Sequence, residues 1–331
     1  MKLKKYLSLF IKLLIAGGII YWLATQGKFN FIAIKEVLKP DFILIAVVLS
    51  GVNLFILSER WRLLLQTQNS HPKTFDLFKL TLIGTFFNFA MPGGVGGDLV
   101  KAFYFYKDNP TSKALAVSSV FIDRLLGLFT IVFMALFVMT LDFQHVMSGA
   151  ILSKLYYAFG LIFLLFTFGL FCLFSTNSRM VALVTKFIDF LPLKQKFLKL
   201  YQSGQLYGTE KKLLFKVFGL SILAQIVAVF IMYVIGQYSA SGKLIPLTTY
   251  FIVTPIGFMA TAIPISPAGV GVGQAAFYFL YNAYLNSTSE FGPLVITIYQ
   301  MLQLFFGLVG AFFYLQRKDH SQKINEAEIN T

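Results

Sequence analysis

The sequence predicts an all-α polytopic membrane protein with about six full transmembrane helices and two broken helical hairpins. Of its 331 residues, 57% are hydrophobic and only 13% are charged, whereas about a quarter of a soluble domain is charged. Six apolar stretches approach the roughly 20 residues with which a helix spans a bilayer. Two further apolar segments are interrupted by glycine and proline. The six predicted spans are 6–23, 42–58, 114–140, 152–174, 213–237 and 292–315.

The first of these spans follows a basic start, as a signal peptide would. We interpret it as a retained span, because its apolar run is long and no small-x-small cleavage site follows. With the N-terminus inside, the pieces assigned to the cytoplasm hold 21 Lys and Arg, against 5 in the outer pieces. Basic residues collect on the cytoplasmic side of membrane proteins. This bias predicts that both termini are cytoplasmic, and it explains the net charge of +14 without a nucleic-acid partner.

A single integral membrane domain is expected over residues 1–316, followed by a polar cytoplasmic tail, 317–331. Its first half would be about 1–175 and its second half about 213–316. Between them, the basic segment 177–212 contains "KFIDFLPLKQKFLKLYQSG", which mixes Phe and Leu with Lys at near-helical spacing. We expect an amphipathic helix, broken at Pro192, on the inner leaflet, where anionic lipid attracts basic residues. An ordinary basic loop is the alternative.

The two interrupted segments resemble each other. Residues 75–106 contain "NFAMPGGVGGDLVKAFYFY", and residues 246–285 contain "TAIPISPAGVGVGQAAFYFLY". Each has proline, then G-V-G, a short gap and A-F-Y-F, which indicates an internal repeat. The flanking arms, such as 98–106 and 274–285, are too short to span a bilayer. We therefore expect two re-entrant hairpins.

The charge map predicts that these hairpins enter the membrane from opposite faces. The first begins and ends beside basic pieces, and the second beside pieces almost without Lys or Arg. Inverted repeats with broken helices that meet near the midplane are typical of secondary transporters.

The glycines of the two breaks predict a polar pocket. Irregular backbone at membrane depth is tolerated only within protein or along a water-filled cavity. A helix that restarts there presents N–H groups and a positive dipole end, which suits a phosphate. Spacing of the G-x-x-x-G type can equally indicate close helix packing alone. The candidate headgroup-binding positions at the breaks are Gly93, Gly94, Gly96, Gly97, Ser266, Gly269, Gly271 and Gln274.

Charged residues within apolar surroundings are the other candidates, because intramembrane charge is costly and often functional. Asp98 and Lys101 lie three residues apart and could pair on one helix face. Asp123 and Arg124 lie inside an apolar span. Arg124 is the best candidate to hold a phosphate through its planar fork, unless these charges only neutralise one another. Arg60, in "SERWRLLL", either follows the positive-inside bias or points toward the pocket.

These motifs resemble the membrane domain of bacterial lysylphosphatidylglycerol synthases, the multiple peptide resistance factor family, and its stand-alone flippase-like relatives. The resemblance rests on "ERW", "FFNFAMPGGVGGDLVKAF", "FIDRLLG" and "PISPAGVGVGQAAF". It implies a bacterial inner-membrane protein with two pseudo-symmetric halves and a lipid-accessible cavity. Asp98 and Lys101 match the family pattern, but Gln274 stands where a glutamate is common. Only 16 residues follow Leu315, so we expect no soluble transferase domain.

We therefore expect a lipid flippase that moves a phospholipid or polyprenyl-phosphate headgroup between leaflets. The sequence has no G-K-[ST] motif for ATP, and its three histidines are scattered, so neither an enzyme nor a cofactor is expected. Two alternatives stay open. The chain could be a non-catalytic partner of a lipid-modifying enzyme, such as a membrane-associated glycosyltransferase, or it could transport an ion or small solute.

Overall fold

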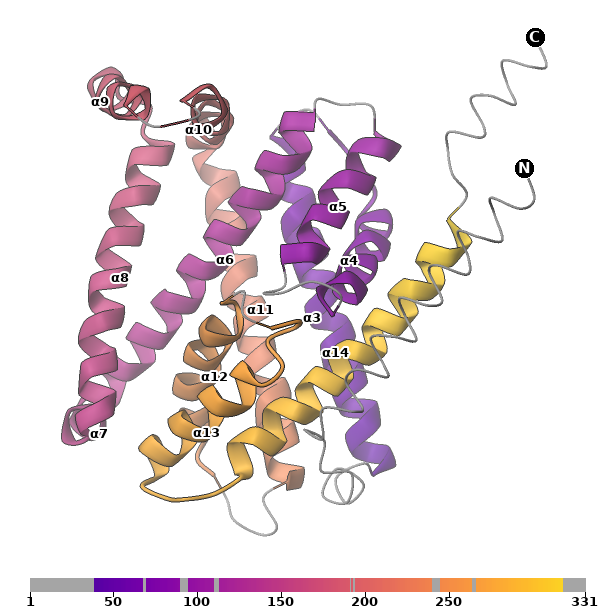
Figure 1. Ribbon diagram of the computed structural model, residues 1–331, viewed down its shortest axis with the longest axis vertical. Coiled ribbons are helices and arrows are strands. Elements are labelled where there is room, and N and C mark those ends of the chain that lie inside the picture. Colours follow the sequence, from indigo (N-terminus) through magenta and orange to yellow (C-terminus); the bar gives the residue numbers. More distant parts are fainter. Residues whose placement is uncertain are drawn as a thin grey trace.

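The computed structural model describes residues 39–67, 70–89, 95–109, 113–190, 192, 194–239, 245–263 and 266–317. Helices α3 to α14 account for most of these residues (Figure 1). The predicted first span, 6–23, and the tail from residue 318 lie outside the described residues. The helices are α3 (Pro40–Gln66), α4 (Thr74–Asn88), α5 (Val95–Asp108), α6 (Lys113–Leu141), α7 (Phe143–Ser148), α8 (Ala150–Phe174), α9 (Ser178–Asp189), α10 (Lys194–Thr209), α11 (Lys211–Ser239), α12 (Leu247–Thr261), α13 (Val272–Leu285) and α14 (Phe291–Gln316).

Five helices in the described part of the chain are long and apolar enough to span a membrane: α3, α6, α8, α11 and α14. They confirm five of the six predicted spans. Helix α3 runs eight residues past the predicted end at 58, through "ERWRLLLQ". The sequence prediction stopped at charged residues, but Arg60 is buried and paired within the protein. Its charge therefore does not require the helix to end at the membrane surface.

The two interrupted segments form helical hairpins, α4–α5 and α12–α13, as predicted. In Figure 1, α4 and α5 occupy the upper half of the molecule, at the end that carries α9 and α10. Helices α12 and α13 occupy the lower half, toward the end that carries α7. The hairpins therefore enter from opposite ends, and the inverted arrangement predicted from the charge map is confirmed.

The tips of the two hairpins touch. The Ala268 backbone N–H donates to the Asn88 carbonyl over 3.0 Å. Phe89 and Val270 are both buried in a small apolar cluster at the same place. Each broken segment thus gives the other a backbone hydrogen-bond partner, which irregular backbone inside a membrane needs because lipid offers none.

Close helix crossings depend on glycine. A Cβ atom at Gly310 of α14 would lie 2.0 Å from the Leu82 carbonyl oxygen of α4, and one at Gly97 of α5 would lie 2.2 Å from the Gly84 oxygen. Small residues let helix backbones approach in this way within membranes. The first contact holds α4 of the first hairpin against α14, and the second holds the two arms of that hairpin together.

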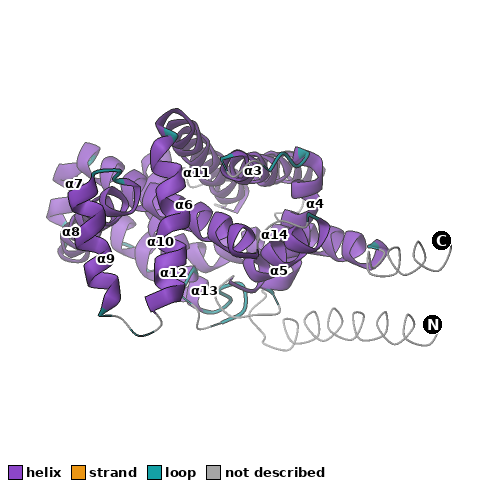
Figure 2. Ribbon diagram, turned by 90° about the horizontal axis from the view of Figure 1, so that it is seen from above, coloured by secondary structure: helices purple, strands orange, loops and turns teal. Residues whose placement is uncertain are grey.

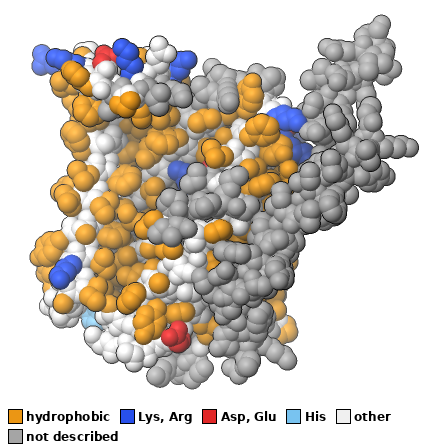
Figure 3. All heavy atoms as spheres, viewed as in Figure 1, with side chains coloured by type: hydrophobic (Ala, Val, Ile, Leu, Met, Phe, Trp, Pro, Cys, Tyr) orange, Lys and Arg blue, Asp and Glu red, His pale blue; other side chains and the backbone are white. Residues whose placement is uncertain are grey.

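Helix α8 stands at the edge of the bundle in both ribbon views (Figures 1 and 2). Only 6% of its most apolar window is buried, which suits a helix surrounded by lipid. Figure 3 shows hydrophobic side chains over much of this face, with Lys and Arg gathered at the top, where α9 and α10 lie. The break between α9 and α10 falls around Pro192, as predicted. Their position on a membrane surface stays a prediction.

Candidate functional site

A cavity of about 330 Å³ lies where the first hairpin meets the long helices and the tip of the second hairpin. The first half of the chain lines it with residues of α3, α4, α5 and α6. The second half lines it with residues of α11, α12 and α14. The cavity therefore lies between the two halves of the chain. Its polar and charged lining residues are Arg60, Thr81, Thr85, Asn88, Asp98, Lys101, Asp123, Arg124, Gln225, Thr261, Tyr299, Gln300 and Gln303.

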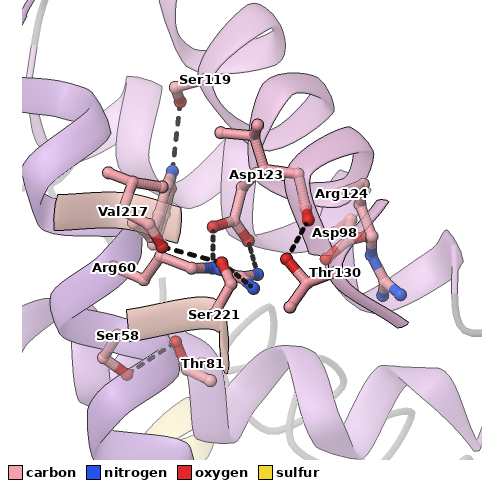
Figure 4. Close-up of polar contacts among 12 residues, drawn as sticks. Ser58, Arg60, Thr81, Asp98, Ser119, Asp123, Arg124, Thr130, Val217 and Ser221 are labelled. Atoms are coloured by element: carbon pink, nitrogen blue, oxygen red, sulfur yellow. Dashed lines mark hydrogen bonds and ion pairs between the residues drawn. The ribbon is translucent and has the colours of Figure 1, made fainter. Parts of the chain in front are cut away.

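The innermost charges form a bidentate ion pair between α3 and α6 (Figure 4). Arg60 Nε donates to Asp123 Oδ1 over 2.7 Å, and Nη2 donates to Oδ2 over 2.9 Å. Arg60 Nη1 also donates to the Ser221 hydroxyl of α11 over 3.3 Å. Both side chains of the pair are less than one-tenth exposed. A Cβ at Gly127 would lie 3.2 Å from Nη1, so this glycine makes room for the guanidinium.

A second ion pair joins Arg124 of α6 to Asp98 of α5. Figure 4 shows both side chains beside the first pair. Here the Arg124 side chain is 46% exposed, whereas Asp98 is 15% exposed. The Arg124 side chain is therefore nearly half exposed, while its partner is mostly enclosed. Arg124 and Asp98 thus form the ion pair that the alternative allows, and the role of Arg124 in holding a phosphate stays a prediction.

Lys101 differs from the two arginines. It is 8% exposed, and its Nζ lies 4.6 Å from the centre of the Trp61 ring, a cation–π contact. Trp61 is held by a hydrogen bond from its indole N–H to Ser119 Oγ and by edge contact with Phe105. Among the described residues Lys101 forms no ion pair. The Asp98–Lys101 pair that helical spacing allows is not formed, because Asp98 is taken by Arg124.

The charges of the cavity do not balance. Its described lining contains three cationic side chains, Arg60, Lys101 and Arg124, and two carboxylates, Asp98 and Asp123. Both carboxylates are paired with arginine. One positive charge, on Lys101, is thus left without a carboxylate. In a low-dielectric site, this excess favours binding of an anion.

The backbone amides at the hairpin tips are partly occupied by protein groups. The Gly97 N–H donates to Asn88 Oδ1 over 2.9 Å, and the Gly271 N–H donates to Gln274 Oε1 over 2.6 Å. Two of the amides that the sequence indicated as anion donors therefore already have acceptors. The cationic side chains, rather than these amides, give the cavity its charge.

Gln274 connects two helices through hydrogen bonds. Its Nε2 donates to Thr297 Oγ1 over 3.0 Å and to Gln300 Oε1 over 2.9 Å, which ties α13 to α14. The left-handed φ angles of Gly269 and Gly271, +69° and +91°, turn the chain at this tip. Glycine adopts that conformation without steric cost. The Ser266 hydroxyl is buried without a hydrogen-bond partner among the described residues.

The structure brings six of the sequence-predicted residues to the cavity: Arg60, Gly97, Asp98, Lys101, Asp123 and Arg124. Gly93 and Gly94 lie outside the described residues. Gly97 lines the cavity and also packs against Gly84. It therefore agrees with both interpretations of the glycine motif, a pocket lining and close helix packing. The remaining candidates shape the tips without lining the cavity: Gly96, Ser266, Gly269, Gly271 and Gln274.

Sequence reasoning missed the polar wall contributed by the second half. Gln225 of α11 and Tyr299, Gln300 and Gln303 of α14 all line the cavity. Their signal was polar residues inside otherwise apolar spans, as in "SILAQIVAV" and "TIYQMLQLFF". Polar groups in such places usually face the bundle interior. Across the described residues there is no group of three His, Cys, Asp or Glu side chains that could hold a metal ion.

Fold and site together define a multi-pass α-helical membrane protein in which two oppositely directed broken hairpins enclose a charged cavity. The chain belongs to the family of the lysylphosphatidylglycerol synthase transmembrane region, whose model matches residues 9–310. A stretch of 127 residues is 28% identical to a UPF0104 membrane protein of Methanocaldococcus jannaschii. This similarity covers 36% of the chain and 38% of that relative. No solved structure matches the chain.

Proposed function

We propose that this protein is a flippase-like transporter that moves phosphate-bearing lipid headgroups between the leaflets of the bacterial inner membrane, with both termini cytoplasmic. The observation that carries the proposal is the positive excess in the cavity between the two hairpins. A phosphodiester headgroup carries one negative charge and would balance it. The family relationship to the membrane region of a lipid-modifying synthase is in keeping with a lipid substrate.

In this proposal, Lys101 and Arg124 hold the phosphate. Lys101 offers an ammonium that no described carboxylate pairs with, and Arg124 offers a guanidinium on a side chain that is nearly half exposed. Hydrogen bonds from charged donors are stronger than those from neutral ones. Arg60 and Asp123 stay paired beneath them and fix the distance between α3 and α6. The acyl chains remain in the bilayer beside the apolar outer faces of the helices.

Movement of the headgroup requires the two halves to open in turn toward the two leaflets. Rocking of one repeat against the other around a fixed central site is the usual motion of inverted-repeat transporters. The contact between Ala268 and Asn88 is the point at which the halves would separate. Transport would be passive or ion-coupled, and we propose no enzymatic step, because both cavity carboxylates are engaged by arginine.

The proposal is tested by following headgroup movement in proteoliposomes that contain labelled phospholipids. We expect Lys101→Met to slow movement of anionic lipid about tenfold or more, the effect of losing a charge-assisted hydrogen bond worth about 1.5–3 kcal/mol. Methionine keeps an apolar stem against Trp61, so the packing is conserved. Lys216→Met, at an exposed position of α11, is the matched control and should transport normally.

Three results would contradict the proposal. Folded wild-type protein that moves no lipid above empty vesicles would point instead to a partner of a lipid-modifying enzyme, which copurification would then seek. A current that depends on a soluble ion, and not on the lipid headgroup, would identify a solute transporter. Equal transport rates for Lys101→Met and Lys216→Met would show that Lys101 does not hold the headgroup.

A further inference from the structure

The wall of the cavity that the second half of the chain contributes has polar but uncharged side chains. Gln225 of α11 and Tyr299 and Gln303 of α14 line the cavity, and none of their three side chains forms a hydrogen bond with any residue that the structure describes. The Gln225 Oε1 atom is buried. A buried acceptor without a partner is costly and is seldom left so in a folded protein. This wall therefore has hydrogen-bonding capacity that the protein itself does not use.

The α14 contribution comes from one helix face. Ile296, Tyr299, Gln300 and Gln303 follow the spacing of three and four residues that places side chains in one stripe, and all four line the cavity. Gln300 is already engaged, because its Nε2 donates to the Ala268 carbonyl over 3.2 Å and its Oε1 accepts from Gln274. Tyr299 and Gln303, one turn apart, are left to face the contents of the cavity.

Amide and phenol groups can both donate and accept hydrogen bonds, as can the hydroxyl groups of glycerol or a sugar. An added cationic group fits this wall poorly. The cavity already has an excess positive charge, and its two described carboxylates are occupied by arginine. A second anionic group fits poorly too, because one phosphodiester already balances the single excess positive charge of the described lining.

We propose that the cavity recognises an uncharged, hydroxyl-bearing group attached to the phosphate: Lys101 and Arg124 hold the phosphodiester, and Gln225, Tyr299 and Gln303 bind the hydroxyls. The proposal rests on the function proposed above and narrows its substrate class to polyol or sugar phosphodiesters. The hydroxyls come either from the glycerol of a phospholipid headgroup or from a sugar on a polyprenyl phosphate. An aminoacylated headgroup is disfavoured.

The experiment compares lipids of equal charge that differ only in hydroxyls. In proteoliposomes, labelled phosphatidylglycerol is measured against phosphatidylethanol, and a polyprenyl glycosyl phosphate against a polyprenyl methyl phosphate. We expect at least one hydroxyl-bearing lipid to move about five- to tenfold faster than its partner, as when one or two hydrogen bonds discriminate between substrates. The pair that shows the preference identifies the source of the hydroxyls.

Gln225→Met and Gln303→Met are expected to bring that ratio toward one. Methionine has nearly the volume of glutamine but cannot accept a strong hydrogen bond. Because Gln225→Met removes a buried unpartnered oxygen, its thermal unfolding temperature should not fall, and a lost preference would then not reflect unfolding. Gln316→Met, exposed at the end of α14, should keep the wild-type ratio.

Equal rates within both lipid pairs for the wild-type protein would overturn this inference and leave the proposed transport intact. Faster movement of lysylphosphatidylglycerol than of phosphatidylglycerol would also overturn it, because the wall would then accept a cation. Retention of the full preference in both Gln225→Met and Gln303→Met would remove these side chains from the site. Failure of all lipids to move would instead reject the transport function itself.

Discussion

Arg60 and Arg62 lie two residues apart on α3 but in very different surroundings. Arg60 is paired with Asp123 in the interior, with both side chains less than one-tenth exposed. Arg62 is paired with Glu59, three residues before it, and both side chains are 25% exposed. Losing one partner of a buried pair leaves a charge without compensation, whereas an exposed pair contributes little.

Arg60→Met is therefore expected to lower the free energy of unfolding by about 3–5 kcal/mol. The double substitution Arg60→Met with Asp123→Leu should recover most of that loss, because no charge is then stranded. Arg62→Met should cost less than about 1 kcal/mol. Unfolding in mixed detergent micelles measures all three, and equal losses for Arg60→Met and Arg62→Met would contradict the buried pair.

The Trp61 ring is placed to report on Lys101, whose Nζ lies 4.6 Å from its centre. The chain has two tryptophans, so Trp22→Phe leaves Trp61 as the only tryptophan, whose emission is excited selectively at wavelengths that tyrosine does not absorb. When an anionic headgroup draws the ammonium away from the ring, the Trp61 emission should change. A titration with phosphatidylglycerol in detergent measures the change, and it should be absent in the added variant Lys101→Met. An identical response with and without Lys101 would contradict the contact.

For individual residues, the sequence could identify the charged candidates but not their partners. Asp98, Lys101, Asp123 and Arg124 were identified because they lie within apolar segments of the sequence. Their pairing depends on which faces of α3, α5 and α6 meet, and helical spacing carries no such information. Arg60 and Asp123 are 63 residues apart, so their contact exists only after the helices pack.

Among the elements, α14 illustrates how glycine sets the approach of two helices. A methyl group at Gly310 would lie 2.0 Å from the Leu82 carbonyl oxygen, and the clash is with rigid backbone. At Gly219 of α11, by contrast, nothing lies within 4 Å. The two glycines have the same sequence context, an apolar helix, but opposite structural roles.

Gly310→Ala is expected to destabilise the protein by about 1–3 kcal/mol, the usual cost of overpacking. Gly219→Ala should instead stabilise it by up to about 1 kcal/mol, because alanine favours the helix more than glycine does. Thermal unfolding in detergent, followed by circular dichroism, compares the two. A stabilising effect of Gly310→Ala would mean that α14 and α4 are farther apart than described.

The hairpins were predictable from the sequence, because proline and glycine interrupt apolar runs that are too short to cross a membrane on either side. The end of α3 was not predictable in the same way. A hydropathy scale assigns every arginine an unfavourable value inside the membrane, whatever its surroundings. Arg60 is enclosed with Asp123, and the scale does not account for a charge that is neutralised by another residue of the protein.

For the whole molecule, the contact between the hairpin tips defines one conformation of a proposed transport cycle. Phe89 of the first hairpin and Val270 of the second belong to one buried cluster. If the two halves rock against each other during transport, the contact between Phe89 and Val270 must open. If the halves stay fixed, the contact is present throughout.

Cysteines at positions 89 and 270, introduced as Phe89→Cys and Val270→Cys in a Cys172→Ser background, are expected to crosslink on oxidation. The crosslink should stop lipid movement, and reduction should restore it, because the halves are then free to separate. Lipid movement measured before and after reduction, with each single-cysteine variant as a control, checks this. Undiminished transport in fully crosslinked protein would rule out rocking at the tips.

The distribution of Lys and Arg was sufficient to predict that the hairpins are inverted, since it assigns each loop to one side. The inverted pattern also suggested that the broken segments meet, but the particular contact between the tips could not be deduced. It depends on a backbone hydrogen bond between Ala268 and Asn88, and a backbone bond leaves little trace in side-chain identity. The polar wall of Gln225, Tyr299, Gln300 and Gln303 was also missed. Each glutamine occurs singly in an apolar span, and the sequence alone does not show that the helices bring them together.

The bond between Asn88 and Ala268 also has a consequence for how the chain is made. The ribosome completes the first hairpin, which ends at Asp108, about 160 residues before it supplies Ala268, an interval on the order of ten seconds at usual rates of synthesis. During that interval the Asn88 carbonyl has no protein partner at its final depth. We expect the nascent first hairpin to stay near the membrane surface or within an insertion machinery, and to reach its final depth only when the second hairpin arrives.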